Sequence, residues 1–86
     1  MLEEKKLFIK KLLFRSKYMG CKENNMLFAS FAENNLENLS EIDLILYHEL
    51  IKNDDETLLG WICGKLKIPA KFTEIITKIR NFKIKS

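Results

Sequence analysis

The hydrophobic residues of this chain recur at intervals of three and four positions, which is the periodicity of an amphipathic α-helix. The pattern is clearest near the C-terminal end, where the apolar positions are Phe72, Ile75, Ile76, Ile79 and Phe82. They share one face of a helix whose other face is rich in lysine, and Pro69 lies near its first turn, where proline is tolerated. No run of four or more residues alternates apolar with polar side chains as a half-buried β-strand does. The sequence therefore predicts an all-α fold.

Four further helices are predicted before this one, over residues 2–18, 23–34, 41–52 and 56–64. Their inward-facing residues are predicted to be Leu2, Ile9, Leu12 and Leu13, then Leu27, Phe28 and Phe31, then Ile42, Ile45, Leu46 and Leu50, and last Leu58, Trp61 and Ile62. Gly20 suits the end of the first helix, Ser40 with Asp43 forms an approximate capping box for the third, and Asn53 to Asp55 cap the fourth. The short connections predict a compact antiparallel bundle of five helices, a single domain over residues 1–86 with a radius of gyration of about 12 Å.

The charges are segregated along the chain, although the formal net charge is only +3. Residues 1–22 carry 7 basic and 2 acidic side chains, residues 23–63 carry 1 and 9, and residues 64–86 carry 7 and 1, so the three segments have charges of +5, −8 and +6. A uniformly basic nucleic-acid binder would not show this pattern. The basic terminal helices still leave a small helical nucleic-acid-binding domain as the alternative function, if both fold onto one side of the molecule.

Composition excludes several other classes of protein. A chain that is 47% hydrophobic and 31% charged is too apolar for a disordered protein, and no apolar run approaches the ~20 residues that a membrane span needs. Lysines interrupt the apolar N-terminal stretch, so we expect no export signal. A third, weaker hypothesis places helix 2–18 on an anionic membrane surface through Lys5, Lys6, Lys10 and Lys11.

The residues that could carry catalysis or bind metal are few. His48 is the single histidine, and it is more readily explained as a structural residue than as a general base. Cys21 and Cys63 are isolated, so we expect neither a disulfide framework nor a zinc site, and two free thiols suit a reducing compartment. Asp54 and Asp55 are better explained as helix caps than as calcium ligands. We expect a protein that is not an enzyme.

The junction between the first two predicted helices has an unusual concentration of polar and aromatic side chains. We call this junction the corner, and the residues around it are Arg15, Lys17, Tyr18, Lys22 and Glu23. One interpretation is a capped junction with a solvated charge cluster; the other is a docking edge, since a rigid corner presents an aromatic ring and charges of both signs at low entropic cost. Trp61 likewise is either a core residue or a contact residue.

Two short motifs in the chain resemble those of a known protein family. The first is Met19-Gly20-Cys21-Lys22-Glu23 at the junction, and the second is Asp55-Glu56-Thr57-Leu58-Leu59-Gly60-Trp61 in the fourth helix. In their order and spacing, and in the residues that open and close the third helix, the chain resembles the small succinate dehydrogenase flavinylation (flavoprotein assembly) factors of bacteria and mitochondria. The resemblance covers about residues 12–83. Members of that family have Arg-Gly-x-x-Glu at the first motif and Asp-x-x-Leu-x-x-Trp at the second.

The resemblance implies a helical chaperone that binds the flavoprotein subunit of succinate dehydrogenase, or of fumarate reductase, and promotes covalent attachment of FAD to it. It implies a partner-binding set of Arg15, Lys17, Tyr18, Met19, Gly20, Lys22 and Glu23, with Asp55 and Trp61 as a secondary contact. FAD would belong to the client, so no stably bound cofactor is expected, and neither is a metal or nucleic acid. We expect a monomer in a bacterial cytoplasm, or in the mitochondrial matrix if the source is eukaryotic, with the bacterial case favoured.

The chain departs from the family pattern at one position, because Met19 stands where the motif has arginine. Two interpretations are open. Arg15, Lys17 or Lys22 reaches the same client groups, or this member binds its client without promoting the reaction.

Overall fold

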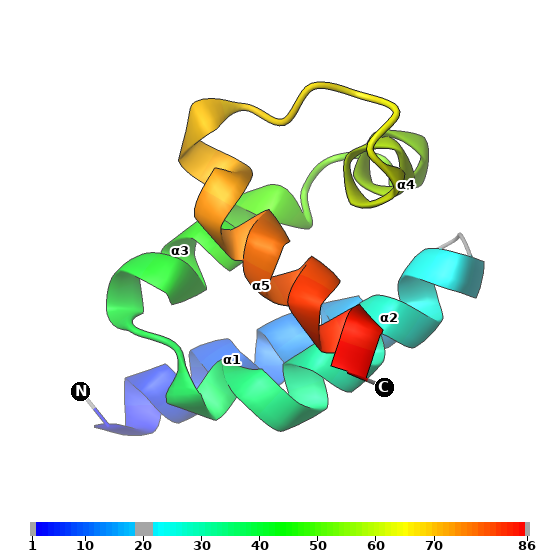
Figure 1. Cartoon of the computed structure of the whole chain (residues 1–86). Helices are drawn as coiled ribbons and strands as arrows, with labels where there is room; N and C mark the ends of the chain where they lie inside the picture. Colours follow the sequence, from blue (N-terminus) through cyan, green and yellow to red (C-terminus); the bar gives the residue numbers. More distant parts are fainter. Residues whose placement is uncertain (1, 19–21, 86) are drawn as a thin grey trace.

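The computed structural model describes residues 2–18 and 22–85, with side chains described over residues 3–18 and 25–82. Within these residues the chain forms five α-helices and two short 3₁₀ segments (Figure 1). They are α1 (Leu2–Lys17), α2 (Lys22–Asn35), η1 (Leu36–Asn38), α3 (Glu41–Leu50), α4 (Asp55–Cys63), η2 (Ala70–Phe72) and α5 (Thr73–Lys85). The predicted all-α bundle is confirmed, and the radius of gyration of 12.1 Å agrees with the value expected from chain length.

The α1 and α2 helices pack against each other, and α5 crosses α2 (Figure 1). The α5 helix contacts α2, α3 and α4, so its apolar face fills the centre. Ile75, Ile76 and Ile79 on this face are fully buried, and Phe82 packs at its edge, as the sequence predicted. The buried residues of the other elements are Leu12, Phe28, Phe31, Ala32, Leu36, Leu39, Leu44, Tyr47, Leu50, Ile51, Leu58, Trp61, Ile62 and Phe72.

The predicted inner face of the third helix is confirmed at Leu46 and Leu50 and wrong at its other two positions. Ile42 and Ile45 are 71% and 53% exposed, whereas Leu44 and Tyr47 are buried in the core together with Leu50. The apolar residues of α3 surround most of its circumference, so periodicity alone does not select a face. The polar contacts of Tyr47, described below, determine which face of α3 is buried.

The helix caps follow the sequence closely. The Oγ atom of Ser40 accepts a hydrogen bond of 3.1 Å from the backbone N–H of Asp43, which confirms the cap of α3. Asp54 accepts hydrogen bonds from the side chain and backbone N–H of Thr57, and these bonds lower the pKa of the Asp54 carboxyl. Gly64 ends α4 in the left-handed conformation, with a φ of 80°. The expected cap at Gly20 lies outside the described residues.

The buried carboxylate of Asp43 gives a test of how α3 is joined to α5. Lys78 on α5 donates a hydrogen bond of 2.9 Å to Asp43 Oδ2, and the Asp43 side chain is nearly out of solvent. Lys71 makes a similar ion pair of 3.2 Å with Glu49, but both of those side chains are well exposed. Removing the partner of a desolvated charge costs more than removing that of a hydrated one. We therefore expect Lys78→Met to lower the free energy of unfolding by about 1 kcal/mol and Lys71→Met by less than about 0.5 kcal/mol in urea titrations. Equal losses in the two variants would show that burial of Asp43 does not matter.

Candidate functional site

The structure places Arg15 against the end of α3. Its Nη2 atom donates a hydrogen bond of 3.1 Å to the backbone carbonyl oxygen of Ile51. This carbonyl belongs to the C-terminal turn of α3, where helix carbonyls lack partners within the helix and a cation is favourable. The side chain remains exposed as a whole, so further N–H groups of the guanidinium face solvent. Arg15 thus has a role inside the fold besides the partner contact expected from the sequence.

Lys17 is also tied to the chain itself. Its Nζ atom lies 3.2 Å from Glu33 Oε1, and both side chains are about half exposed. The ion pair links the end of α1 to α2 beside the junction. Exposed pairs of this kind contribute only ~0–1 kcal/mol, so this pair adds little to the stability of the fold.

The aromatic character of the corner is stronger than the sequence indicated. Tyr18 is 69% exposed, as a docking residue would be, and its ring stacks at a tilt of 38° on that of Phe14, which is 66% exposed. The ring centroids are 4.7 Å apart. Phe14 was not among the predicted site residues, although it lies one helical turn before Tyr18 and off the inner face of α1.

The central motif is only partly described. Met19 and Gly20 lie outside the described residues, while Lys22 and Glu23 form the first turn of α2 with their side chains undescribed. A carboxylate in a first turn is stabilised by the helix dipole. Asn25, in the same turn region, has a buried Oδ1 atom with no hydrogen-bond partner within the described part of the chain. Such an acceptor is costly to leave unpaired.

A buried polar contact missed by the sequence analysis fixes the helices beneath this corner. The Ser16 hydroxyl is fully buried and donates to the Leu12 carbonyl oxygen at 2.7 Å. Its one proton is used there, so in the 2.6 Å contact with the Tyr47 hydroxyl Ser16 accepts and Tyr47 donates. The Tyr47 ring packs against Phe28 and Phe31 of α2. Burial raises the pKa of Tyr47 far above its usual value. The burial of Ser16 could have been predicted from its position four residues after Leu12, on the apolar face of the helix.

The proposed secondary contact residues lie in α4. Asp55 opens the helix and is partly buried, whereas Trp61 is only 6% exposed and packs against Phe72, with ring centroids 5.6 Å apart. Trp61 also lines a surface depression with His48 and Pro69. Trp61 is thus a core residue with one edge at the surface, and its role as a contact stays a prediction.

The other reactive residues show no catalytic arrangement among the residues described. His48 is partly buried, with its ring 5.4 Å from that of Phe8 in an edge-to-face contact, which gives it a packing role between α3 and α1. Cys63 is an exposed free thiol, and Cys21 falls outside the described residues. Over the described ranges we find no cluster of histidine, cysteine and acidic side chains suited to a metal ion, and no helix long and apolar enough to span a membrane.

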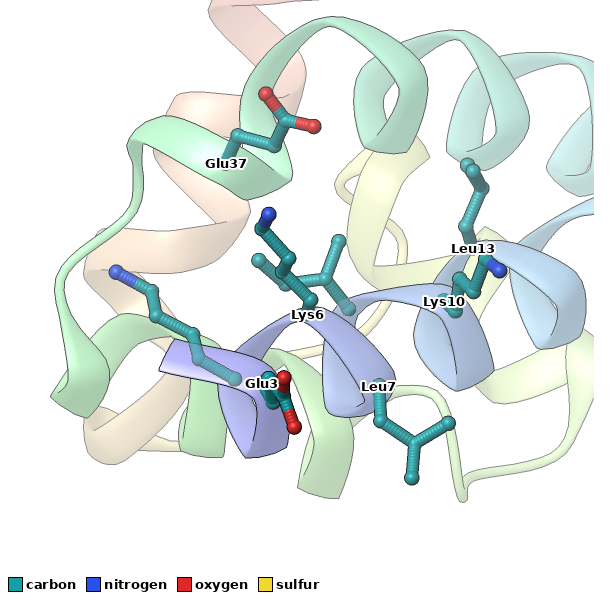
Figure 2. Close-up of a pocket in the computed structure, with 8 residues that line it drawn as sticks. Glu3, Lys6, Leu7, Lys10, Leu13 and Glu37 are labelled. Atoms are coloured by element: carbon teal, nitrogen blue, oxygen red, sulfur yellow. The ribbon is translucent and has the colours of Figure 1, made fainter. Parts of the chain in front are cut away.

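Two adjoining hollows follow the exposed side of α1. One lies between α1 and η1 and is lined by residues that include Glu3, Lys6, Leu7 and Glu37 (Figure 2). The other continues toward the corner and is lined by Lys10, Lys11, Leu13, Phe14, Lys17 and Tyr18. Both hollows are open to solvent, so they suit the side chains of a partner better than an enclosed small molecule.

Comparison with known proteins gives a consistent result. The family model described as flavinator of succinate dehydrogenase matches residues 10–83. Among curated proteins, the chain is similar to mitochondrial succinate dehydrogenase assembly factor 2 from three organisms. Identity is 37% over 73 residues in Dictyostelium discoideum, 43% over 76 residues in Caenorhabditis elegans and 34% over 76 residues in Caenorhabditis briggsae. Each alignment covers 84% of this chain and 52%, 64% and 62% of the respective relative. No solved structure matches significantly.

Two points follow from these matches. The chain spans only about half to two thirds of the length of these curated relatives. The relatives carry mitochondrial names, which runs against the preference for a bacterial cytoplasm expressed from the sequence, while the matched family supports the assembly-factor hypothesis over the nucleic-acid alternative.

Proposed function

Because this chain belongs to the family of flavinators of succinate dehydrogenase, we propose that it binds the flavoprotein subunit of that enzyme and promotes covalent attachment of FAD to it. The observation that carries the proposal is the match over residues 10–83, which includes the corner between α1 and α2 and extends through α4 into α5. The flavoprotein of fumarate reductase is a second client of the same chemistry.

The mechanism we propose is that of a conformational chaperone. Joining a flavin methyl carbon to a client imidazole requires removal of a proton from the methyl group, stabilisation of charge on the flavin ring and an aligned histidine. Client residues and the flavin itself can meet all three requirements. Holding the client in the conformation in which flavin and histidine are aligned removes an entropic barrier, and the effect is limited by the difference in affinity for the two client conformations. This chain then needs no catalytic side chain.

The contact we propose is the corner. Glu23 accepts a hydrogen bond from a client cation or backbone N–H, and Gly20 allows the two backbones to approach. Tyr18 adds exposed aromatic surface, and Arg15, Lys17 and Lys22 supply positive charge. Asn25 Oδ1 has no hydrogen-bond partner among the described residues, and a client donor that reached it would satisfy this acceptor. Asp55 and Trp61 form the secondary contact. We expect the chain to act as a monomer in the reducing compartment where the flavoprotein matures, which is mitochondrial if its source is eukaryotic.

The test is reconstitution. Purified flavoprotein subunit that lacks covalent flavin is incubated with FAD, with and without this chain, and covalent flavin is read as fluorescence in a denaturing gel. We expect the chain to raise the rate of attachment and to form a complex with the subunit in gel filtration. If the complex forms but fluorescence does not rise, the chain with Met19 in place of arginine binds the subunit without promoting flavin attachment. If neither the complex nor the rise is seen, the proposed function is refuted.

A further inference from the structure

The outward side of α1 carries an exposed apolar ridge, formed by Leu7, Phe14 and Tyr18, which we call the α1 ridge. These side chains are 55%, 66% and 69% exposed. At spacings of seven and four residues they lie along one line of the helix, over about 16 Å from first to last. The opposite side of α1 carries Leu12 and Ser16 and is buried. Helix α1 therefore has two apolar faces, of which the fold covers one.

Positive charge borders the ridge on both sides. At 100° per residue, Lys10 and Lys17 fall on one side of the Leu7–Phe14–Tyr18 line, while Lys11 and Arg15 fall on the other. Within the described residues Lys10 and Lys11 form no ion pair, so both charges are available to a partner. The hollow nearest the corner has only lysine as its charged lining. A ligand of this surface must be acidic and must also offer an apolar group.

The ridge is held in place from behind. Ser16 on the buried face is hydrogen-bonded to Tyr47, and Arg15 is hydrogen-bonded to the carbonyl oxygen of Ile51, so α1 is fixed against α3. The rings of Phe14 and Tyr18 also contact each other. Rigid aromatic groups lose little conformational entropy on binding, which is a property of interface anchors.

We propose that the α1 ridge is a docking surface for an acidic segment of the client flavoprotein that carries at least one apolar side chain. The assignment to that client rests on the proposed function. Acidic side chains of the segment pair with Lys10 and Lys11, and the apolar side chain packs on Phe14 and Tyr18. The surface extends the contact from the corner backward along α1, to residues on which the family motif gives no information.

The charges at the far end of the ridge favour a protein over an anionic membrane. Glu3 and Glu37 line the hollow next to Leu7, together with Lys5 and Lys6. Glu37 comes from η1, which lies across from the residues of α1 that line the same hollow (Figure 2). The two glutamates weaken the attraction of this end to a uniformly anionic lipid surface, whereas a polypeptide can place its acids opposite Lys10 and Lys11 and avoid Glu3 and Glu37.

The experiment compares two sets of variants with matched controls. Phe14→Ser tests the ridge against Ile42→Ser, which removes a side chain of similar exposure on α3. Lys10→Glu/Lys11→Glu tests the charge against Lys65→Glu/Lys67→Glu, which makes the same change in net charge at exposed residues between α4 and α5. Affinity for the purified flavoprotein subunit is measured by calorimetry at 50 and 300 mM NaCl. We expect the test variants to lose about tenfold in affinity and the controls to stay within about twofold.

The outcomes separate this inference from the proposed function. Unchanged affinity in both test variants, while the chain still promotes covalent flavin attachment, would overturn the ridge and leave the function standing. Failure of the unaltered chain to bind the subunit would overturn both. The chain is also tested for flotation with vesicles of phosphatidylserine and phosphatidylcholine. If Phe14→Ser abolishes flotation but leaves binding of the subunit unaffected, the ridge binds membrane and the inference is overturned. If the glutamates reduce helix content in circular dichroism, Lys10→Gln/Lys11→Gln serves as the charge test.

Discussion

Replacement of Tyr47 by alanine should lower the free energy of unfolding by about 3–5 kcal/mol, the range found for removing a large buried aromatic side chain. Tyr47 is fully buried, its ring packs on Phe28 and Phe31, and its hydroxyl donates to Ser16. It therefore joins α1, α2 and α3 at one point. A chain of this length has about 4–13 kcal/mol of stability in total, so the variant should be largely unfolded or melt far earlier in circular dichroism. A melting temperature close to that of the unaltered chain would contradict this assignment of the core.

Tyr47→Phe separates the hydroxyl from the ring. We expect it to cost about 1 kcal/mol at neutral pH, because the Ser16 hydroxyl loses a donor but keeps its bond to Leu12. At high pH we expect the reverse, with Tyr47→Phe more stable than the unaltered chain. Burial raises the pKa of Tyr47, whereas in the unfolded chain tyrosine ionises near pH 10, so Tyr47 lowers stability by up to about 1.4 kcal/mol per pH unit above pH 10 and has no such effect below it. Tyr47→Phe should lose this part of the alkaline decline, while Tyr18→Phe, at an exposed residue, should retain it.

The comparison of α5 with α3 shows how far periodicity predicts a fold. In α5 the isoleucines form one stripe opposed by lysines, and the predicted face is the buried one. In α3 apolar residues lie on most sides, and the buried face is determined by tertiary contacts, namely Tyr47 with Ser16 and Asp43 with Lys78. Such contacts join residues 31 and 35 positions apart. A local pattern carries no information on them.

The structure bears on only part of what the sequence predicted for the candidate site, because Met19 and Gly20 lie outside the described residues. Tyr18 is exposed as expected, yet Arg15 and Lys17, taken as free charges for a partner, have partners within the chain. Phe14 was assigned no role, although it lies off the predicted inner face of the first helix, and its exposure and its contact with Tyr18 are seen only in the structure. The ridge follows only from the structure, since both faces of α1 bear apolar residues.

The segmental charge of the sequence also finds a structural explanation. Each ion pair seen between described side chains joins a basic terminal segment to the acidic middle segment: Lys17 to Glu33, Lys71 to Glu49 and Lys78 to Asp43. The basic terminal segments thus pack against the acidic middle segment, and opposite charges meet where they do. Part of the basic surface is neutralised in this way, which weakens the case for phosphate binding by the terminal helices. Among the described lysines only Lys17, Lys71 and Lys78 form ion pairs, so Lys10 and Lys11, which border the α1 ridge, belong to the larger group that forms none.

Glu23→Ala should weaken binding of the flavoprotein subunit by about 10- to 100-fold, the loss expected when a hydrogen bond to a charged group is removed from an interface. The glutamate is the one ionisable residue of the family motif that this chain retains, since Met19 replaces the arginine. Its place in the first turn of α2 favours a carboxylate that accepts from a client N–H or cation. Affinity is measured by calorimetry alongside Gly20→Arg, which should weaken the complex by crowding the same approach.

The matched control is Glu41→Ala, which removes an exposed carboxylate from the first turn of α3 and carries the same change in charge and in helix dipole. Circular dichroism should show similar helix content in both variants, because each loses only the few tenths of a kcal/mol that such a residue contributes. Glu23→Gln keeps an acceptor without the charge, so an intermediate affinity would indicate an N–H partner and a full loss a cation. If Glu23→Ala and Glu41→Ala bind the client equally well, the corner is not the site of docking, and the α1 ridge and the edge of Trp61 are then the surfaces to test.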